Sequence, residues 1–240
     1  MLWLYLEEPC MPASFQHRFS DLLQEPASTL TYRLRETADH APHSRLLLLH
    51  GVGGNEMSMT GLAASLPGDV EVLLVRAPQT LAPGQFAWFN VRFTPEGPFI
   101  DADQAERSRG QLIELIRALN RQQPLPTVIA GFSQGGILSS SVALSAPAEV
   151  KGFGLLCGRI LPQLAPHIAP ADALANLQAF VAHGVHDTKL PVSWAHKADQ
   201  LLTELGVQHR MQLYPMGHEL TADVARDFNG WLLDLTGLTG

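Results

Sequence analysis

The segment TVIAGFSQGGILSSSVALSA, residues 127–146, decides the fold that we predict for this chain. Its first six residues form a short apolar run without alternation, which is typical of a strand buried on both faces of a parallel sheet. GFSQG follows, matches the pattern GxSxG, and leads into a helix-like stretch. In such a strand-to-helix turn, Gly131 and Gly135 leave room for a sharp reversal that lifts the Ser133 hydroxyl above the sheet edge. The context therefore predicts Ser133 as a nucleophile.

Outward from this segment, apolar runs that predict strands alternate with segments whose apolar residues have helical spacing. This alternation predicts βαβ units, and therefore an α/β fold with a mostly parallel central sheet and helices on both faces. The predicted strands end in Gly-containing or polar residues, and such folds bind ligands at the C-terminal edge of the sheet. The other predicted strands comprise residues 45–51, 70–78, 152–158 and 179–184, and the predicted helices include residues 59–66, 112–119, 194–205 and 224–235.

Composition narrows the class of protein. Of the 240 residues, 46% are hydrophobic and 16% are charged, as expected for a globular domain. Sixteen Lys and Arg against 23 Asp and Glu give a formal net charge of -7, which is the wrong sign for a nucleic-acid-binding protein. Cys10 and Cys157 are too few for a disulfide framework or a thiolate zinc site and fit a reducing compartment. We expect one α/β domain over residues 29–240, preceded by an N-terminal extension, residues 1–28.

The chain shows no pattern typical of a membrane segment or a signal peptide. The longest apolar runs, such as residues 46–49, are far shorter than the roughly 18 to 20 residues of a membrane span. The N-terminal apolar run has no positive residue beyond the amino terminus, and Glu7 and Glu8 follow it. We therefore expect no stable membrane insertion and a cytoplasmic location.

A serine hydroxyl becomes nucleophilic when a base accepts its proton, so the motif requires a histidine that an acid orients. Two predicted strand ends supply these residues in the chain order Ser, Asp, His. HGVHD places Asp187 just past a predicted strand, and MQLYPMGHEL places His218 after the next strand-like run. We therefore predict Ser133, Asp187 and His218 as the catalytic residues.

Acyl transfer also requires two backbone N–H groups that stabilise the negative charge on the carbonyl oxygen. Gln134 follows the nucleophile at a predicted helix N-terminus and offers one of them. The glycines of HGVGGN, after an earlier predicted strand, let the backbone approach closely, and Val52 is the expected second donor. This set of residues predicts chemistry without a metal or a cofactor.

The connection from Gln79 to about Asp101 is long and rich in aromatic residues. Long connections within compact domains are usually lids or binding loops. Its aromatic side chains fit two arrangements equally well, the wall of an acyl pocket or the packed core of a lid. For the first arrangement, Trp88 and Phe89 are the expected substrate-binding residues. The four aromatic residues are Phe86, Trp88, Phe89 and Phe93.

Several motifs, in this order, resemble those of the phospholipase/carboxylesterase family of α/β-hydrolases, which includes the acyl-protein thioesterases. The family generally has an acidic residue where Asn90 stands and a small polar residue where Cys157 stands. The matching motifs are LLLLHGVGGNE, AWFN, GFSQGG, LLCGRILP, AHGVHDTKLP and YPMGHEL, which spread from about residue 45 to 220.

The resemblance implies an α/β-hydrolase fold and a serine hydrolase that cleaves carboxylic esters or thioesters through an acyl-enzyme intermediate. It also implies a Ser133, Asp187, His218 triad, an oxyanion hole formed by the amides of Val52 and Gln134, and a substrate groove over AWFN. A carboxylesterase or a lysophospholipase-like enzyme fits this pattern best. The expected partner is a small-molecule acyl ester or thioester, and a homodimer is left open.

Two other interpretations of the sequence remain. The first is a metal-dependent hydrolase, because His183, His186 and Asp187 lie within five residues and are zinc-binding residue types. The second is a catalytically silent hydrolase fold that acts as a binding protein, since a fold does not determine a function. A serine-directed reagent distinguishes the silent protein from the enzyme.

Overall fold

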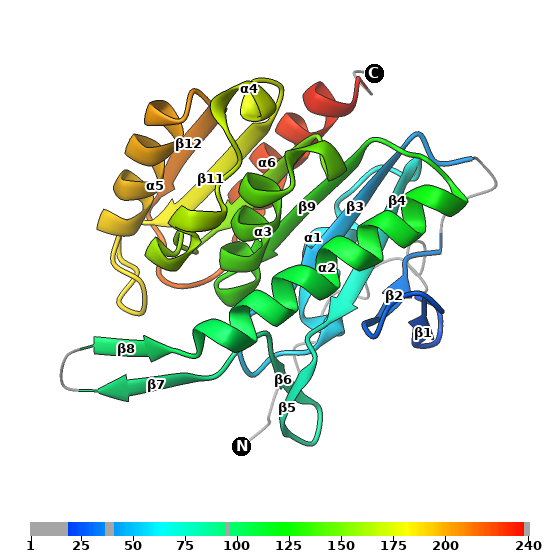
Figure 1. Ribbon diagram of the computed structural model, residues 1–240, viewed down its shortest axis with the longest axis horizontal. Coiled ribbons are helices and arrows are strands. Elements are labelled where there is room, and N and C mark those ends of the chain that lie inside the picture. The colour runs from blue at the N-terminus through cyan, green and yellow to red at the C-terminus, as the bar shows by residue number, and fades with distance from the viewer. Residues whose placement is uncertain (1–18, 37–40, 95–96, 238–240) are drawn as a thin grey trace, which may run out of the picture.

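The computed structural model describes residues 19–36, 41–94 and 97–237, and its central feature is an eight-stranded sheet (Figure 1). The strand order is β1-β2-β4-β3-β9-β10-β11-β12. β1 and β2 are antiparallel at one edge, and the six strands from β4 to β12 run parallel. The strands are β1 (Leu23–Gln24), β2 (Thr31–Leu34), β4 (Val70–Arg76), β3 (Ser44–Leu49), β9 (Thr127–Phe132), β10 (Gly152–Leu156), β11 (Gln178–Gly184) and β12 (Gln208–Tyr214).

Helices cover both faces of the sheet, which is why the central strands are apolar without alternation (Figure 1). In β3, Leu47 and Leu49 pack into the core beneath α2, α3, α4 and α5, whereas Leu46 and Leu48 pack against α1 and α6 on the opposite face. The helices are α1 (Thr60–Ala64), α2 (Ala102–Gln122), α3 (Gln134–Ser145), α4 (Ala171–Leu174), α5 (Ser193–Glu204) and α6 (Ala222–Thr236), with short 3-10 turns η1 (Glu56–Met59), η2 (Pro147–Glu149) and η3 (Pro162–His167).

The predicted α/β fold is confirmed, including the five apolar strands and the helix after GFSQG. β2 lies within residues 30–36, where polar and apolar residues alternate, and β1 pairs with its outer side. The opposite edge is β12, which precedes the final helix as expected.

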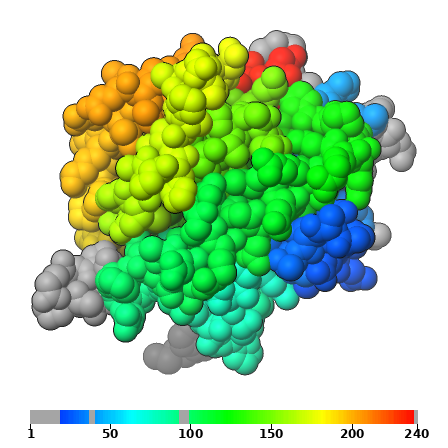
Figure 2. Space-filling model, viewed as in Figure 1, coloured from blue at the N-terminus to red at the C-terminus, as the bar shows by residue number. Residues whose placement is uncertain are grey.

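The segment from Gln79 to Ile100 forms two hairpins rather than an irregular loop. The first pairs β5 (Gln79–Ala82) with β6 (Gln85–Ala87), and the second pairs β7 (Val91–Thr94) with β8 (Gly97–Ile100). Both hairpins lie beyond one end of the central strands (Figure 1). The space-filling view shows this segment along the lower edge of the molecule (Figure 2).

The N-terminal part of the chain is described from Phe19, which forms a bridge with Arg35. Part of this segment contacts α2, where the Gln122 side chain donates to Glu25 at 2.8 Å and that of Gln111 donates to Thr29 at 2.8 Å. The expected extension of residues 1–28 thus includes β1, whereas residues 1–18 lie outside the described part, and the boundary at residue 28 stays a prediction. Within the described residues, no helix has both the length and the apolarity needed to cross a membrane.

Candidate active site

Ser133 sits between the end of β9 and the start of α3 with φ 54° and ψ -114°, a backbone conformation that L-residues rarely adopt. Two glycines make this turn sterically feasible. A Cβ at Gly131 would lie 2.4 Å from the carbonyl carbon of Gly135, and a Cβ at Gly135 would lie 2.2 Å from the carbonyl oxygen of Leu49. The N–H of Ser133 donates to the Leu156 carbonyl at 2.8 Å, which ties the turn to β10. The GxSxG spacing is therefore required by backbone packing.

Ser133, His218 and Asp187, predicted from three separate motifs, lie in one hydrogen-bonded row. His218 Nδ1 is 2.6 Å from Asp187 Oδ2, and His218 Nε2 is 2.9 Å from Ser133 Oγ. Because a carboxylate only accepts, Nδ1 of the neutral imidazole carries the proton and donates to Asp187. Nε2 then has a free lone pair and accepts the hydroxyl proton of Ser133. This is the arrangement that a general base and its nucleophile require.

Hydrogen bonds from its own loop hold Asp187 in place, in addition to its contact with His218. Its Oδ1 accepts the backbone N–H groups of Lys189 and Leu190, each at 2.8 Å. Burial raises the pKa of the Asp187 carboxyl. The hydrogen bonds from His218 and from the two backbone N–H groups together lower the pKa by more than burial raises it, so the pKa lies below its usual value. The carboxylate therefore stays ionised while it holds the imidazole.

The expected oxyanion-hole residues, Val52 and Gln134, line the same cavity as Ser133. The backbone N–H groups of Val52 and Gln134 have no hydrogen-bond acceptor among the described residues. The Gln134 side chain is buried and serves a different purpose, because its Oε1 accepts the Trp88 N–H at 2.8 Å and its Nε2 donates to the Phe89 carbonyl at 2.7 Å. One residue thus offers a free amide and also holds the 88–89 segment in place.

His50 supports the other side of the oxyanion loop and was not identified from the sequence. Its Nδ1 donates to the Gly51 carbonyl at 2.7 Å, and its Nε2 accepts the Ala77 N–H at 3.1 Å. The side chain is buried, and this desolvation lowers the pKa of His50, which keeps the ring neutral. Its position at the end of β3, directly before the glycines, is the sequence signal that could have identified it.

Trp88 and Phe89 are both fully buried but have different surroundings. Phe89 lines the cavity at Ser133, whereas Trp88 is not among the lining residues. Trp88 Nε1–H donates to the His50 carbonyl at 2.9 Å, so its indole packs behind the oxyanion loop. The geometry therefore favours a cavity-wall position for Phe89 and a core position for Trp88, and the expectation that either residue contacts substrate stays a prediction. The side chain of Phe93 lies outside the described residues.

The cavity above Ser133 has a volume of about 360 Å³, which is within the range for small-molecule sites. Its walls are mainly apolar, and two cationic side chains, Arg159 and Lys189, are also part of the lining. Neither cation was singled out from the sequence. The lining residues are Gly51, Val52, Phe89, Val91, Ile100, Phe132, Ser133, Gln134, Ile137, Arg159, Lys189, Leu190 and His218.

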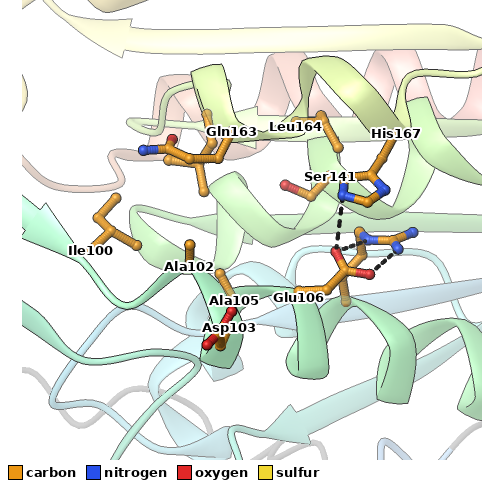
Figure 3. Close-up of a pocket in the computed structure, with 11 residues that line it drawn as sticks. Ile100, Ala102, Asp103, Ala105, Glu106, Ser141, Gln163, Leu164 and His167 are labelled. Atoms are coloured by element: carbon orange, nitrogen blue, oxygen red, sulfur yellow. Dashed lines mark hydrogen bonds and ion pairs between the residues drawn. The ribbon is translucent and has the colours of Figure 1, made fainter.

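A second, smaller cavity of about 190 Å³ lies between α2 and η3 and shares Ile100 with the first (Figure 3). Three of its charged or titratable groups, Glu106, Arg109 and His167, contact one another. Glu106 Oε2 accepts from Arg109 Nε at 2.8 Å and lies 4.0 Å from His167 Nε2, as the dashed lines in Figure 3 indicate. Hydrogen bonding to Arg109 lowers the pKa of Glu106.

His183, His186 and Asp187, the residues of the alternative metal-site interpretation, do not gather around one point. His183 is fully buried and its Nε2 donates to the Leu190 carbonyl at 2.7 Å, whereas His186 is exposed. In the described part of the chain, the only three potential ligands close enough for one ion are Cys157, Asp187 and His218, which include two members of the Ser133 row. Burial raises the pKa of the Cys157 thiol to about 12, so it is a poor thiolate donor.

The sequence of this chain is similar to those of known proteins. The family model described as Phospholipase/Carboxylesterase matches residues 35–232. The chain is 27% identical over 217 residues to acyl-protein thioesterase 1 of Eremothecium gossypii, which covers 84% of this chain and 91% of the relative. It is 28% identical over 189 residues to the putative hydrolase MhqD of Bacillus subtilis, which covers 78% and 90%.

Solved structures show the same fold. A carboxylesterase from Mesorhizobium loti superposes with a TM-score of 0.75 at 22% identity and covers 89% of this chain and 99% of that chain. Zea mays acyl-protein thioesterase 2 superposes with a TM-score of 0.71 at 18% identity and covers 86% and 99%.

Proposed function

Because the chain belongs to the phospholipase/carboxylesterase family, we propose that it hydrolyses carboxylic esters and thioesters through an acyl-enzyme on Ser133. The observation that carries the proposal is the hydrogen-bonded row from Ser133 through His218 to Asp187, in a cavity also lined by Val52 and Gln134, whose backbone N–H groups have no acceptor among the described residues. Relatives with names such as acyl-protein thioesterase and carboxylesterase support the reaction class.

In the acylation step, Ser133 Oγ attacks the acyl carbon while its proton moves to His218 Nε2. The carbonyl oxygen becomes negatively charged and accepts hydrogen bonds from the N–H groups of Val52 and Gln134. Asp187 accepts from Nδ1–H and stabilises the imidazolium. When the tetrahedral intermediate collapses, the bond to the leaving oxygen or sulfur breaks, and Nε2–H protonates the leaving group as it departs.

Deacylation repeats these steps with water in place of the serine. His218 Nε2 accepts a proton from water, the resulting hydroxide attacks the acyl carbon, and the same two N–H groups stabilise the second oxyanion. The Ser133 ester bond then breaks, and Ser133 Oγ recovers its proton from His218. The products are a carboxylic acid and a free enzyme, and the proton transfers use Ser133, His218 and Asp187, which already lie within hydrogen-bond distance of one another.

The experiment that tests this proposal is active-site labelling. Treatment with a fluorophosphonate should add one adduct to the intact mass, mapped to Ser133, and Ser133→Ala should lose both the label and the hydrolysis of 4-nitrophenyl butyrate. Ser139, which is buried in α3 and donates to the Gly135 carbonyl at 2.9 Å, provides the matched control as Ser139→Ala.

Two results would contradict the proposal. A silent binding protein would take up no label, and a metal-dependent hydrolase would lose activity on dialysis against a chelator and regain it with zinc. The homodimer and the cytoplasmic location expected from the sequence stay predictions, as does the choice between ester, thioester and lysophospholipid substrates.

A further inference from the structure

Arg159 is a charged residue that is almost completely buried beside the cavity at Ser133. It follows β10 in the run LLCGRILP, is only 9% exposed, and lines the cavity above Ser133. Its guanidinium lies over the ring of Trp194 at the start of α5, with Cζ 4.7 Å from the ring centroid. The ring covers one face of the guanidinium, and such a contact does not use the N–H donors, which lie in the guanidinium plane.

None of these donors has a hydrogen-bond or ion-pair partner among the described residues, and Nε is buried with no acceptor at all. Desolvation by burial lowers the pKa of Arg159, and no neighbouring charge offsets it. A buried cation without a counter-ion is costly, and native proteins pair such groups with an anion or place them where a ligand supplies one.

The other arginines with little exposure show how this chain treats a structural cation. Arg45 pairs with Glu71, and Arg35 donates to four backbone carbonyls. In the smaller cavity of Figure 3, Arg109 pairs with Glu106. Arg159 has none of these partners among the described residues, and it lines the cavity that contains the nucleophile.

The cavity itself favours an anion. Its described lining includes Arg159 and Lys189 but no Asp or Glu, although the chain as a whole has a formal net charge of -7. The remaining walls are largely apolar, and a low-dielectric lining strengthens the attraction between the cations and a negative group. Asp187 is buried behind His218 and does not line the cavity.

We propose that Arg159 makes this enzyme selective for esters or thioesters that carry a carboxylate or a similar anionic group in addition to the scissile bond. The proposal rests on the proposed function, since it names the substrate class for the Ser133 site. The planar guanidinium binds the anion with paired N–H donors, and the exposed Lys189 adds positive charge at the cavity mouth. Binding the anion in this way fixes the orientation of the acyl carbon relative to Ser133.

The test uses matched substrates that differ only in charge. For an anion on the acyl side, kcat/KM for mono-4-nitrophenyl adipate is divided by that for its methyl ester. For an anion on the leaving group, (4-acetoxyphenyl)acetate is compared with its methyl ester, in which a methylene group separates the charge from the phenol. In the wild type we expect the anionic form to be preferred in one of the two pairs.

The variants isolate the contribution of Arg159. Arg159→Met should lower the anionic-to-neutral ratio of the preferred pair by about tenfold to a hundredfold, the range for one hydrogen bond to a charged group. Arg159→Lys should keep part of the ratio. Lys197→Met is the matched control, because Lys197 Nζ lies 4.3 Å from the same Trp194 ring but does not line the cavity, and it should leave the ratio unchanged.

The outcomes separate this inference from the proposed function. An enzyme that labels at Ser133 and hydrolyses the neutral esters, but prefers neither anionic form, overturns the role of Arg159 and leaves the serine mechanism intact. An equal drop in the ratio for Lys197→Met also overturns it, since overall charge would then explain the preference. Absence of labelling and of all hydrolysis would instead refute the serine mechanism.

Discussion

Replacing Asp187 by asparagine tests whether the carboxylate controls the protonation of the catalytic imidazole. The change keeps size and shape, and the Asn oxygen would still accept the N–H groups of Lys189 and Leu190, now at 2.8 Å from Oδ1. The amide nitrogen would then replace Oδ2, which lies 2.6 Å from His218 Nδ1. Because an amide NH₂ only donates, His218 must present a bare Nδ1 and carry its proton on Nε2.

The consequence for activity follows from this forced tautomer. With its proton on Nε2, the ring donates to Ser133 Oγ and no longer accepts the hydroxyl proton, so the general base is lost while the geometry is kept. The equivalent Asp→Asn change in serine proteases lowers kcat by about 10⁴, which corresponds to roughly 5.5 kcal/mol of activation free energy. We expect a loss of that order for Asp187→Asn at neutral pH.

The assay is kcat for 4-nitrophenyl butyrate together with the thermal unfolding midpoint. Asp199→Asn is the matched control, because Asp199 also contacts a histidine, with its Oδ1 3.0 Å from His209 Nε2, but lies outside the cavity. The control should stay within a few fold of the wild type. If Asp187→Asn remains folded and retains more than a tenth of the activity, the Asp187–His218 hydrogen bond does not set the tautomer and the mechanism proposed above is wrong.

Two further predictions concern residues that support the site. Trp88→Ala should lower the free energy of unfolding by roughly 3 to 5 kcal/mol and should depress turnover of short and long acyl esters together, because the indole is part of the core rather than of the cavity wall. A loss of turnover confined to long acyl chains would contradict this prediction. Such a chain-length-dependent loss is instead expected for Phe89→Ala, because Phe89 lines the cavity. Burial raises the pKa of Glu56, but hydrogen bonds from Arg76 and Arg33 lower it more, to about 2 from the usual 4.5. Because the pKa of Glu56 is lowered on folding, its contribution to the free energy of unfolding is complete above about pH 4.5 and is lost as the pH falls toward 2. The loss is about 3 kcal/mol, and acid unfolding of Glu56→Gln should lack it. An identical pH dependence of stability in the wild type and in Glu56→Gln would refute this prediction.

Most of the fold could be predicted because burial on both faces has a direct sequence signature. β3 and β10 are fully buried, β9 is buried except at Phe132, and all three consist mainly of a continuous apolar run. β1 could not be predicted, since it has two residues, both exposed, and its position depends only on pairing with β2. The hairpins between Gln79 and Ile100 are similarly short, and β5 has no buried residue. Such strands are defined by backbone pairing, which apolar patterns do not report.

The candidate catalytic residues were also accessible to sequence analysis, because each follows a strand end and has a defined order along the chain. The contrast between Trp88 and Phe89 was not accessible. These neighbours are equally apolar, and the backbone bonds to the Gln134 side chain determine which ring faces the cavity. Arg159 was missed for a related reason, since an arginine in a sequence carries no mark of whether a carboxylate lies beside it in the fold.

The topology accounts for why Arg159, which has no charged or hydrogen-bonding partner among the described residues, occurs at this particular position. In the parallel part of the sheet, β3, β9, β10, β11 and β12 are consecutive neighbours, so the residues after them meet at one edge. The segments after four of these strands carry Val52, Ser133, Asp187 and His218, and the segment after β10 lies between those of the nucleophile and the acid. Since the acid, the base, the nucleophile and the N–H donors are supplied by the other four, the β10 segment is free to contact the remainder of the substrate. Arg159 is the charged side chain which that segment places in the cavity, and its role is therefore expected in substrate selection rather than in bond cleavage.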